Sequence, residues 1–397
     1  MKITAIIAEY NPLTNGHALH LRRAREETGA DTVLVVMSGS FTQRGEAAIA
    51  DKYMRAEQAI YAGADIVVEL PTIYAISPAD NFAYGAVKTI SAFSDVHYIS
   101  FGSECGDIEK IEKLADLLLN EPAEFSSVLK AGLKSGMPFP KARAEALKAY
   151  AEDHAEYEGL KDILDYPNNS LGVAYVMAVK KAGLDIAFHT VKRVGGGYDS
   201  TDIDSEYPSA TAVREAFKRG ETDKIQNAVP KSVMGMLSVI TPQGDTLGDM
   251  ELFKLKSISG YELENYYDVT GGIHNRLKIA ANDAHDIGTL LNNAKTKNYT
   301  MARLKRIALY ALLDITKKDW EDAVKAPPYV NILALRSDRK DILSLLSMGC
   351  KNVLTRYSDV SKVDKSLRRF IKLDYLTQGT LEIINRSGMF AKKMLLI

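Results

Sequence analysis

The chain has 397 residues, which exceeds the usual size of one hydrophobic core and predicts two domains. With 46% apolar residues, 25% charged residues and a net charge of −1, it has the composition of a globular protein, and any nucleic-acid site would have to be a local patch. No apolar run approaches the roughly 20 residues that span a bilayer, and the N-terminus turns polar too soon for a signal peptide, so we expect a cytoplasmic protein without a membrane partner.

The first hundred residues alternate between short apolar runs and helical patterns. Strands that are apolar along their whole length, separated by helices of about 12 residues, are typical of a parallel sheet covered on both faces. Because parallel crossovers are right-handed, we predict an α/β fold with a doubly wound parallel sheet of the Rossmann type. The predicted strands are 3–8, 31–39, 65–71 and 96–102, and the predicted helices are 17–29, 51–64 and 81–94.

This pattern is interrupted once and then resumes. Residues 107–165 are rich in Ala, Leu, Lys and Glu, and we interpret them as a helical insertion. A linker-like stretch, 241–249, precedes a mainly helical remainder. We therefore predict an α/β domain over 1–245 and a mainly α C-terminal domain over 246–397. The resumed pattern consists of a helix over 170–183, a strand over 186–193, a Gly-rich turn over 195–200 and a helix over 210–220, and the remainder has strand-like runs at 329–335 and 351–357.

The turn EYNPLTNGHALHL, which follows the first predicted strand, is unusually rich in polar residues. It lies at the carboxyl end of a strand, where open parallel sheets bind ligands. Gly16 would let a ligand approach the backbone closely, and His17 and the free N–H groups of the next helix can donate to a phosphate. The alternative is that Asn11 and Thr14 only shape the turn and that His17 caps the helix.

A second polar segment follows the second predicted strand. It contains Ser38, Gln43 and Arg44. An arginine at the carboxyl end of a strand suits bidentate contact with a phosphate or an anionic substrate. The alternative is a solvated arginine in a surface loop.

A third segment, SATAVR, begins the helix near residue 210. Ser209 or Thr211 can cap this helix, and its first turn carries Arg214. A cation in the first turn is unfavourable to the helix dipole unless an anion lies nearby. The arginine therefore favours a polyphosphate site over a simple cap.

Further polar residues follow the same rule of position. Gly102 ends the fourth predicted strand, Asn168 and Asn169 precede a helix, and Lys192 and Arg193 end another strand. Capping is the alternative interpretation of the two asparagines. Because all of these positions map to the carboxyl edge of one sheet, they together predict a single ligand site there.

These segments match a known sequence pattern. TNGH (14–17) resembles the (H/T)xGH motif of a nucleotidyltransferase superfamily, and SATAVR (209–214) resembles its second motif. Together with MSGSFTQRGEAAI, AGADIVVELP, FGSE, PNNSLG and KTKNYTMARLKRI, they make the chain similar to the bacterial tRNA(Met) cytidine acetate ligase family over nearly its whole length. The sequence departs from that pattern at Thr14, where the family usually has histidine, although a hydroxyl can still donate to phosphate.

The resemblance implies an enzyme that uses ATP, with Mg²⁺, to activate acetate as acetyl-adenylate. The acetyl group would then pass to the wobble cytidine of elongator tRNA(Met), forming N(4)-acetylcytidine. The (H/T)xGH nucleotidyltransferase-like domain over 1–245 would bind ATP and carry the chemistry, and the domain over 246–397 would bind tRNA. No metal site built by the protein and no DNA partner are expected.

The resemblance also assigns roles to residues. His17 and Thr14 would act at the α-phosphate, and Arg214 at the leaving β- and γ-phosphates; these three are the predicted catalytic residues. Ser38, Gln43 and Arg44 are possible substrate or phosphate contacts. The predicted ATP-binding residues are Ile7, Ala8, Glu9, Tyr10, Asn11, Pro12, Leu13, Thr14, Asn15, Gly16, His17, Ala18, Leu19, His20, Gly102, Asn168, Asn169, Lys192, Arg193, Ser209, Thr211 and Arg214.

A basic cluster in the C-terminal half is the candidate tRNA-binding surface. Its tyrosine can stack on a base, and its cations can neutralise phosphates. The alternative is the solvated face of a helix whose opposite face is core. The predicted tRNA-binding residues are Lys295, Lys297, Tyr299, Arg303, Lys305 and Arg306.

Two other classes of function remain open on the sequence. One is an adenylyltransferase for a small cofactor precursor, or an acetate-activating ligase with a protein acceptor. The other is a non-catalytic module that binds tRNA or senses a nucleotide. The basic C-terminal half argues against a small free acceptor, and the presence of both His17 and Arg214 argues against a module without chemistry.

Overall fold

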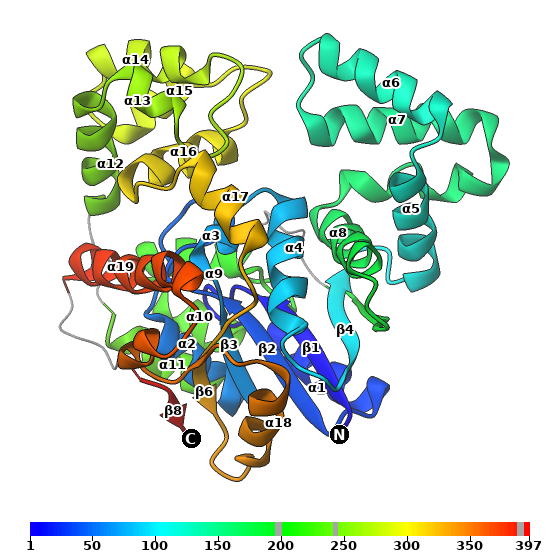
Figure 1. Cartoon of the computed structure of the whole chain (residues 1–397), viewed down its shortest axis with the longest axis vertical. Coiled ribbons are helices and arrows are strands. Elements are labelled where there is room, and N and C mark those ends of the chain that lie inside the picture. The colour runs from blue at the N-terminus through cyan, green and yellow to red at the C-terminus, as the bar shows by residue number, and fades with distance from the viewer. Residues whose placement is uncertain (195–200, 241–244, 387–392) are drawn as a thin grey trace.

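The computed structural model describes residues 1–194, 201–240, 245–386 and 393–397. Its centre is a sheet in the order β5-β4-β1-β2-β3-β6-β7, with β8 beside β6 (Figure 1). The strands from β5 to β3 run parallel, and β6 runs antiparallel to β3. The strands are β1 Ile3–Ala8, β2 Thr32–Ser38, β3 Ile66–Leu70, β4 Val96–Ser103, β5 Ala187–Lys192, β6 Val330–Leu335, β7 Val353–Leu354 and β8 Leu395–Leu396.

The helices of the first part of the chain either cover this sheet or project from it. The covering helices are α1 Asn15–Thr28, α2 Lys52–Tyr61, α3 Thr72–Ala75, α4 Ala79–Ile90, α8 Pro167–Ala182, α9 Ala210–Lys218, α10 Thr222–Ala228 and α11 Lys231–Ser238. The region predicted as an insertion contains α5 Ile108–Asn120, α6 Ala123–Lys134, α7 Phe139–Asp153 and the 3₁₀ helices Ala155–Leu160 and Ile163–Asp165. The predicted Gly-rich turn over 195–200 lies outside the described residues.

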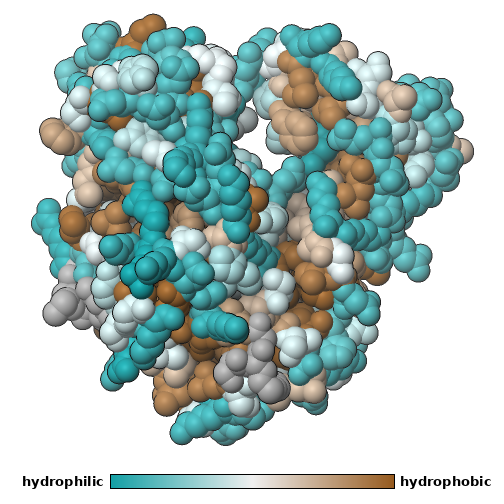
Figure 2. Space-filling view, viewed as in Figure 1, coloured by the Kyte–Doolittle hydropathy of each residue, from teal (hydrophilic) through white to brown (hydrophobic). Residues whose placement is uncertain are grey.

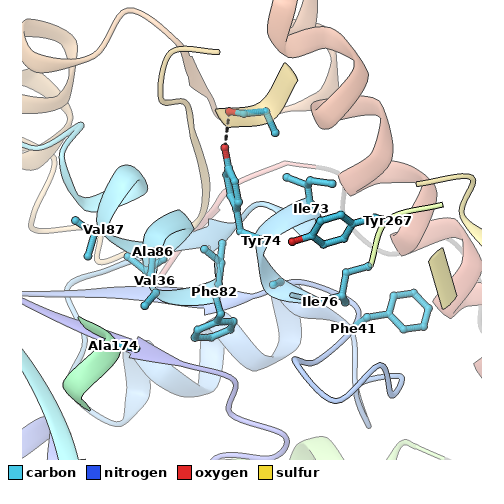
Figure 3. Packing of buried hydrophobic residues seen from close by; sticks show 14 of the residues in the cluster. Val36, Phe41, Ile73, Tyr74, Ile76, Phe82, Ala86, Val87, Ala174 and Tyr267 are labelled. Atoms are coloured by element: carbon cyan, nitrogen blue, oxygen red, sulfur yellow. Dashed lines mark hydrogen bonds between the residues drawn. The ribbon is translucent and has the colours of Figure 1, made fainter. Parts of the chain in front are cut away.

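Apolar side chains of the central strands point alternately to two buried clusters. Leu34 and Val36 of β2 belong to the cluster that includes α4 and α8, and Val33 and Val35 belong to the cluster that includes α1 and α2. Figure 3 shows Val36 in the first of these clusters, together with side chains of α4 and α8. Burial on both faces explains why the strands are apolar along their whole length. The predicted α/β fold with a doubly wound parallel sheet is confirmed.

A helical module follows, and it packs against α3 and α4. The Tyr74 hydroxyl donates to the Ala323 carbonyl at 2.7 Å (Figure 3), and the Tyr74 ring lies edge-on to the Trp320 ring at 5.8 Å. Within the described residues, no helix is both long and apolar enough to cross a bilayer. Of the expected linker, residues 241–244 lie outside the described residues and the rest begins α12. The helices are α12 Thr246–Ser257, α13 Gly260–Glu264, α14 Ile273–Asp283, α15 Ile287–Ala294, α16 Met301–Leu312 and α17 Lys317–Lys325.

The last segment of the chain returns to the sheet. All six residues of β6 are buried, and β6 pairs with β3 through Ile66 and Leu335. The prediction of a separate domain over 246–397 is therefore wrong for the part after residue 329, because a fully buried strand needs a partner sheet and takes the open edge of β3. The helices of this segment are α18 Asp341–Gly349, α19 Arg368–Asn385 and the 3₁₀ helices Tyr357–Ser361 and Lys365–Leu367.

A buried ionic cluster joins this C-terminal segment to the sheet. The Lys52 ammonium lies 2.7 Å from both carboxylate oxygens of Glu69, and both side chains are fully buried. Asn331 of β6 donates to the same carboxylate at 2.6 Å. Asp374 of α19 accepts hydrogen bonds from the Thr72 N–H and from a buried tyrosine hydroxyl. Three distant parts of the sequence thus meet around one buried carboxylate.

Candidate active site

A cavity of about 210 Å³ opens at the carboxyl ends of β1, β4 and β5. It lies where β1 separates β4 from β2, the point at which the strand order reverses and open α/β sheets bind ligands. The structure brings most of the sequence-predicted residues together here. Those that line the cavity are Ile7, Ala8, Glu9, Tyr10, Asn11, Thr14, Gly16, His17, Leu19, His20, Gln43, Arg44, Gly102, Asn168, Lys192, Arg193, Ser209, Thr211 and Arg214.

Several predicted residues support the cavity from outside its lining. Leu13 is buried in the core, and Asn15 donates to the Asn227 carbonyl at 2.8 Å. Ser38 is fully buried, and its carbonyl accepts from Arg55 at 3.1 Å. The predicted residues that do not line the cavity are Pro12, Leu13, Asn15, Ala18, Ser38 and Asn169.

The loop between β1 and α1 is held in place by its neighbours. The Asn11 amide oxygen accepts from the Ile49 N–H at 2.7 Å, and the Glu9 carboxylate accepts from the Gln43 N–H at 2.7 Å. Arg55 is buried and donates to the Glu9 carbonyl at 2.6 Å. These contacts tie the ends of β1 and β2 together, so the loop presents a fixed backbone to the cavity.

His17 occupies the third position of α1 and caps that helix. The Thr14 N–H donates to His17 Nδ1 at 3.0 Å. A ring nitrogen that accepts a hydrogen bond carries no proton, so the neutral ring has its proton on Nε2. Burial, together with the charges of Arg193 and His20, lowers the pKa of His17 to about 3, which keeps the ring neutral near pH 7. Nδ1 therefore caps the helix, and Nε2–H is the ring group that remains for a ligand.

The backbone of residue 14, rather than its side chain, makes this capping contact. Thr14 is 3% exposed, and its hydroxyl lies 3.3 Å from the same Nδ1. Any residue other than proline at position 14 retains the N–H that orients His17. The departure from the usual histidine at Thr14 therefore leaves the tautomer of His17 unchanged.

A second histidine of α1 is held by a chain of hydrogen bonds. His20 Nε2 lies 2.8 Å from the Ser100 hydroxyl, which lies 2.9 Å from His189 Nδ1. His189 Nε2 lies 2.8 Å from a Glu27 carboxylate oxygen. Burial and the neighbouring charges of His189 and Arg193 lower the pKa of His20 to about 4. The chain fixes the orientation of an uncharged ring at the cavity wall.

These two histidines make the folded protein sensitive to acid. An unfolded histidine binds a proton near pH 6.5, whereas folded His17 stays neutral down to about pH 3, so the unfolded state binds more protons in between. We expect the urea midpoint of unfolding to fall as pH drops from 7.5 to 5. The fall should be smaller for His17→Asn and unchanged for the control His97→Asn, whose side chain is exposed. Equal falls in all three proteins would contradict this assignment.

Arg214 links α9 to the first loop. Its guanidinium donates to the Asn11 carbonyl at 2.6 Å and to the Thr211 hydroxyl at 3.2 Å, and the Ser209 hydroxyl caps the helix by accepting from the Ala212 N–H at 3.0 Å. A Glu46 carboxylate oxygen lies 4.0 Å from Arg214. Glu46 is thus an anion close to Arg214, whereas the sequence analysis expected only a phosphate to balance this cation.

The two asparagines lie in the first turn of α8 and not before it as the sequence predicted, because Pro167 already begins the helix, and they have different positions. Asn168 lines the cavity and donates to the Glu104 carboxylate at 2.6 Å. Asn169 is 2% exposed and accepts through its amide oxygen from the N–H groups of Glu104 and Cys105. Gly102 also lines the cavity, and a Cβ there would lie 3.4 Å from the Arg193 side chain, in ordinary van der Waals contact. Asn169 therefore holds the turn after β4, which contains Glu104, the partner of Asn168.

Sequence reasoning missed one wall of the cavity. Phe82 of α4, Phe101 of β4 and Tyr175 of α8 form an apolar side, and Glu46 adds a carboxylate. The aromatic residues sit within apolar helix and strand patterns, which predict only core. The Gln43 side-chain N–H₂ group lies buried in this region without a hydrogen-bond partner among the described residues.

The predicted tRNA-binding residues do not form one free stripe. Arg303 and Arg306 lie 3.2 and 3.7 Å from the Asp268 carboxylate, and Lys305 lies 2.6 Å from Glu46 at the cavity. The lysines of the loop before α16, Lys295 and Lys297, are exposed. Among the predicted cationic residues, Lys295 and Lys297 are the two without an ion pair in the part of the chain that the structure describes.

The α16 helix also packs directly on the loop that carries Gln43 and Glu46. Gly45 has a φ of 74°, and a Cβ there would lie 2.8 Å from the Arg306 backbone nitrogen. Glycine is therefore required both by the backbone conformation and by the contact.

The chain matches known proteins over nearly its whole length. Residues 1–393 match the family described as HIGH Nucleotidyl Transferase. The tRNA(Met) cytidine acetate ligase of Caldanaerobacter subterraneus subsp. tengcongensis is 40% identical over 349 residues, which cover 86% of this chain and 85% of that protein. The tRNA(Met) cytidine acetate ligase of Clostridium perfringens is 36% identical over 378 residues, which cover 94% of both.

Solved structures agree with these relatives. The apo crystal structure of Thermotoga maritima TmcAL superposes with a TM-score of 0.92 at 32% identity and covers all of both chains. A second structure of that protein, bound with alpha-thio ATP, superposes with a TM-score of 0.90. The resemblance seen in the sequence is confirmed, and the chain belongs to the tRNA(Met) cytidine acetate ligase family of HIGH nucleotidyl transferases.

Proposed function

We propose that this protein is an ATP-dependent ligase that acetylates the wobble cytidine of elongator tRNA(Met). One observation carries the proposal: a neutral His17 with a free Nε2–H and the Arg214 guanidinium line one cavity at the switch point of the sheet. A family relative binds an ATP analogue, which supports ATP as the nucleotide. We take Mg²⁺ to enter with the triphosphate, and we expect the enzyme to work in the cytoplasm, where its tRNA is found.

In the first step, an acetate oxygen attacks the α-phosphorus of ATP. The bond from that phosphorus to the bridging oxygen of the β-phosphate breaks, and acetyl-adenylate and pyrophosphate form. Such a displacement needs positioned donors for the charge that builds on phosphate oxygens. His17 Nε2–H donates to the α-phosphate, and Arg214 with the start of α9 holds the leaving phosphates. Asn168 and Gly102 face the adenosine.

In the second step, the exocyclic amine of the cytidine attacks the acetyl carbonyl. The carbonyl-to-phosphate oxygen bond breaks, AMP leaves, and the amine loses one proton as the amide forms. The base must leave its stack to reach the cavity, which favours a nucleotide of the anticodon loop.

An assay of purified protein with ATP, labelled acetate and elongator tRNA(Met) tests this function. We expect label to appear in the tRNA as N(4)-acetylcytidine. Acetate-dependent release of pyrophosphate without label in tRNA would indicate an adenylyltransferase, or a ligase for a small molecule or a protein. Absence of both signals would indicate a binding module.

Arg214→Lys tests the role given to the leaving phosphates. Lysine keeps the charge but loses the planar fork that reaches Asn11 and Thr211, so we expect acetate-dependent pyrophosphate–ATP exchange to slow by about 10- to 100-fold. Arg219→Lys, at the exposed end of the same helix, is the matched control and should leave exchange unchanged. Exchange that survives Arg214→Lys intact would remove this residue from the mechanism.

A further inference from the structure

Two segments that are far apart in sequence contain basic residues but no acidic residues. Residues 125–144 contain Lys130, Lys134, Lys141 and Arg143 and no acidic residue. Residues 287–313 contain five basic residues and no acidic residue. In a chain whose net charge is −1, two such stretches are local patches suited to a polyanion. We call residues 130–141 the insertion tip and residues 295–299 the basic loop.

The insertion tip and the basic loop touch each other. Gly136, in the turn between α6 and α7, has a φ of 84°, and a Cβ there would lie 2.9 Å from the Asn298 amide. Figure 1 shows the turn between α6 and α7 facing the loop between α15 and α16. Figure 2 shows an opening between the two helical lobes that carry them. The two basic segments therefore form one continuous surface.

Both segments are anchored at the rim of the cavity. Arg143 of α7 lies 3.5 Å from Asp80 of α4, and Phe82 of the same helix lines the cavity. On the other side, Lys305 of α16 lies 2.6 Å from Glu46, which also lines the cavity. The surface therefore leads to the place where the cytidine must react.

The side chains of the tip suit RNA. Lys130, Lys134 and Lys141 are exposed, and none of them pairs with a carboxylate in the part of the chain that the structure describes. Between them, Leu133 and Met137 are 40% and 37% exposed, an apolar surface that can lie against unstacked bases or ribose. The stretch contains no acidic residue that would repel a phosphate backbone.

We propose that the insertion tip and the basic loop together form one RNA-binding surface that binds the anticodon arm. This inference rests on the proposed function, because it names the surface that would receive its tRNA. It assigns to the helical insertion a role in RNA binding, which the sequence pattern predicted only for the C-terminal half.

Charge reversal at the tip tests the inference. Lys130→Glu with Lys134→Glu should weaken binding of an unmodified elongator tRNA(Met) transcript by about 10-fold or more at 0.15 M salt, and should flatten the log–log salt dependence by about 1.5 to 2. Acetate-dependent pyrophosphate–ATP exchange should stay within about twofold of the parent protein, because the tip does not line the cavity.

The matched control reverses two exposed lysines at the amino end of the sheet, Lys181→Glu with Lys340→Glu, which changes net charge equally. We expect this control to bind tRNA like the parent. Equal binding by the tip variant and the parent, or equal weakening by tip and control variants, would overturn the inference while leaving tRNA acetylation by the parent intact. Failure of the parent itself to bind or acetylate the transcript would instead overturn the proposed function.

Discussion

We expect His17→Ala to slow acetate-dependent pyrophosphate–ATP exchange by about 10²- to 10³-fold, the usual loss when one donor to a developing charge is removed. The side chain lines the cavity, and its Nδ1 is occupied by the Thr14 N–H, so Nε2–H is the group that is lost to the reaction. Binding of the tRNA transcript should remain, because His17 lies away from the basic surface. Stopped-time exchange assays and filter binding measure the two quantities.

Two further variants separate catalysis from capping. Asparagine at position 17 can place its amide oxygen near Nδ1 and keep the cap, but it cannot reach the position of Nε2. Glutamine can place an N–H₂ group near Nε2. We expect His17→Asn to recover thermal stability without recovering exchange, and His17→Gln to recover part of the exchange. Full exchange in His17→Asn would show that the histidine serves only the helix.

Lys52→Met should destabilise the fold by about 3–5 kcal/mol, the usual cost when one partner of a buried ion pair is removed. The Glu69 carboxylate would keep its hydrogen bond from Asn331 but lose the ammonium that lies 2.7 Å away, and neither Lys52 nor Glu69 has exposed side-chain surface. Urea unfolding followed by circular dichroism measures the change. The C-terminal segment should become the first part to exchange amide hydrogens, because Asp374 and β6 meet the same cluster.

A second substitution tests the cause of that loss. Lys52→Met combined with Glu69→Gln removes both charges, and we expect most of the lost stability to return. Lys88→Met is a control in a partly buried lysine that donates only to backbone carbonyls. A double variant no more stable than Lys52→Met would mean that packing of the lysine stem, rather than its charge, holds the segment.

The sequence was informative where a single physical cause governs a segment. Short, uniformly apolar runs that alternate with helical patterns are typical of strands buried on both faces, and this predicted the parallel core and the edge at which the site lies. It was uninformative where a residue's role depends on a distant partner. The sequence predicted Arg303 and Arg306 as part of an RNA-binding surface. It could not show that both pair with Asp268, which lies two helices earlier in the chain.

The same limit explains the errors at the sheet edge and in the cavity wall. The run around Val330 could be recognised as a strand, but nothing in it says that it pairs antiparallel with β3. Phe82 and Tyr175 have the pattern of core positions, since a helix face that covers a sheet also covers the cavity at its end. Glu46 lies in a polar segment, and the sequence does not show that Lys305 and Arg214, both distant in the chain, lie beside it.

The close packing of Gly45 on α16 has a consequence for the affinities of the protein for nucleotide and for RNA. The loop that lines the nucleotide cavity and the helix that follows the basic loop share a backbone contact and the Lys305–Glu46 pair, so neither can shift alone. If RNA draws α16 toward a different position, the affinity for nucleotide changes, and linkage requires nucleotide to change the affinity for RNA by the same factor. Binding of either substrate would then alter the affinity for the other through this one contact at Gly45.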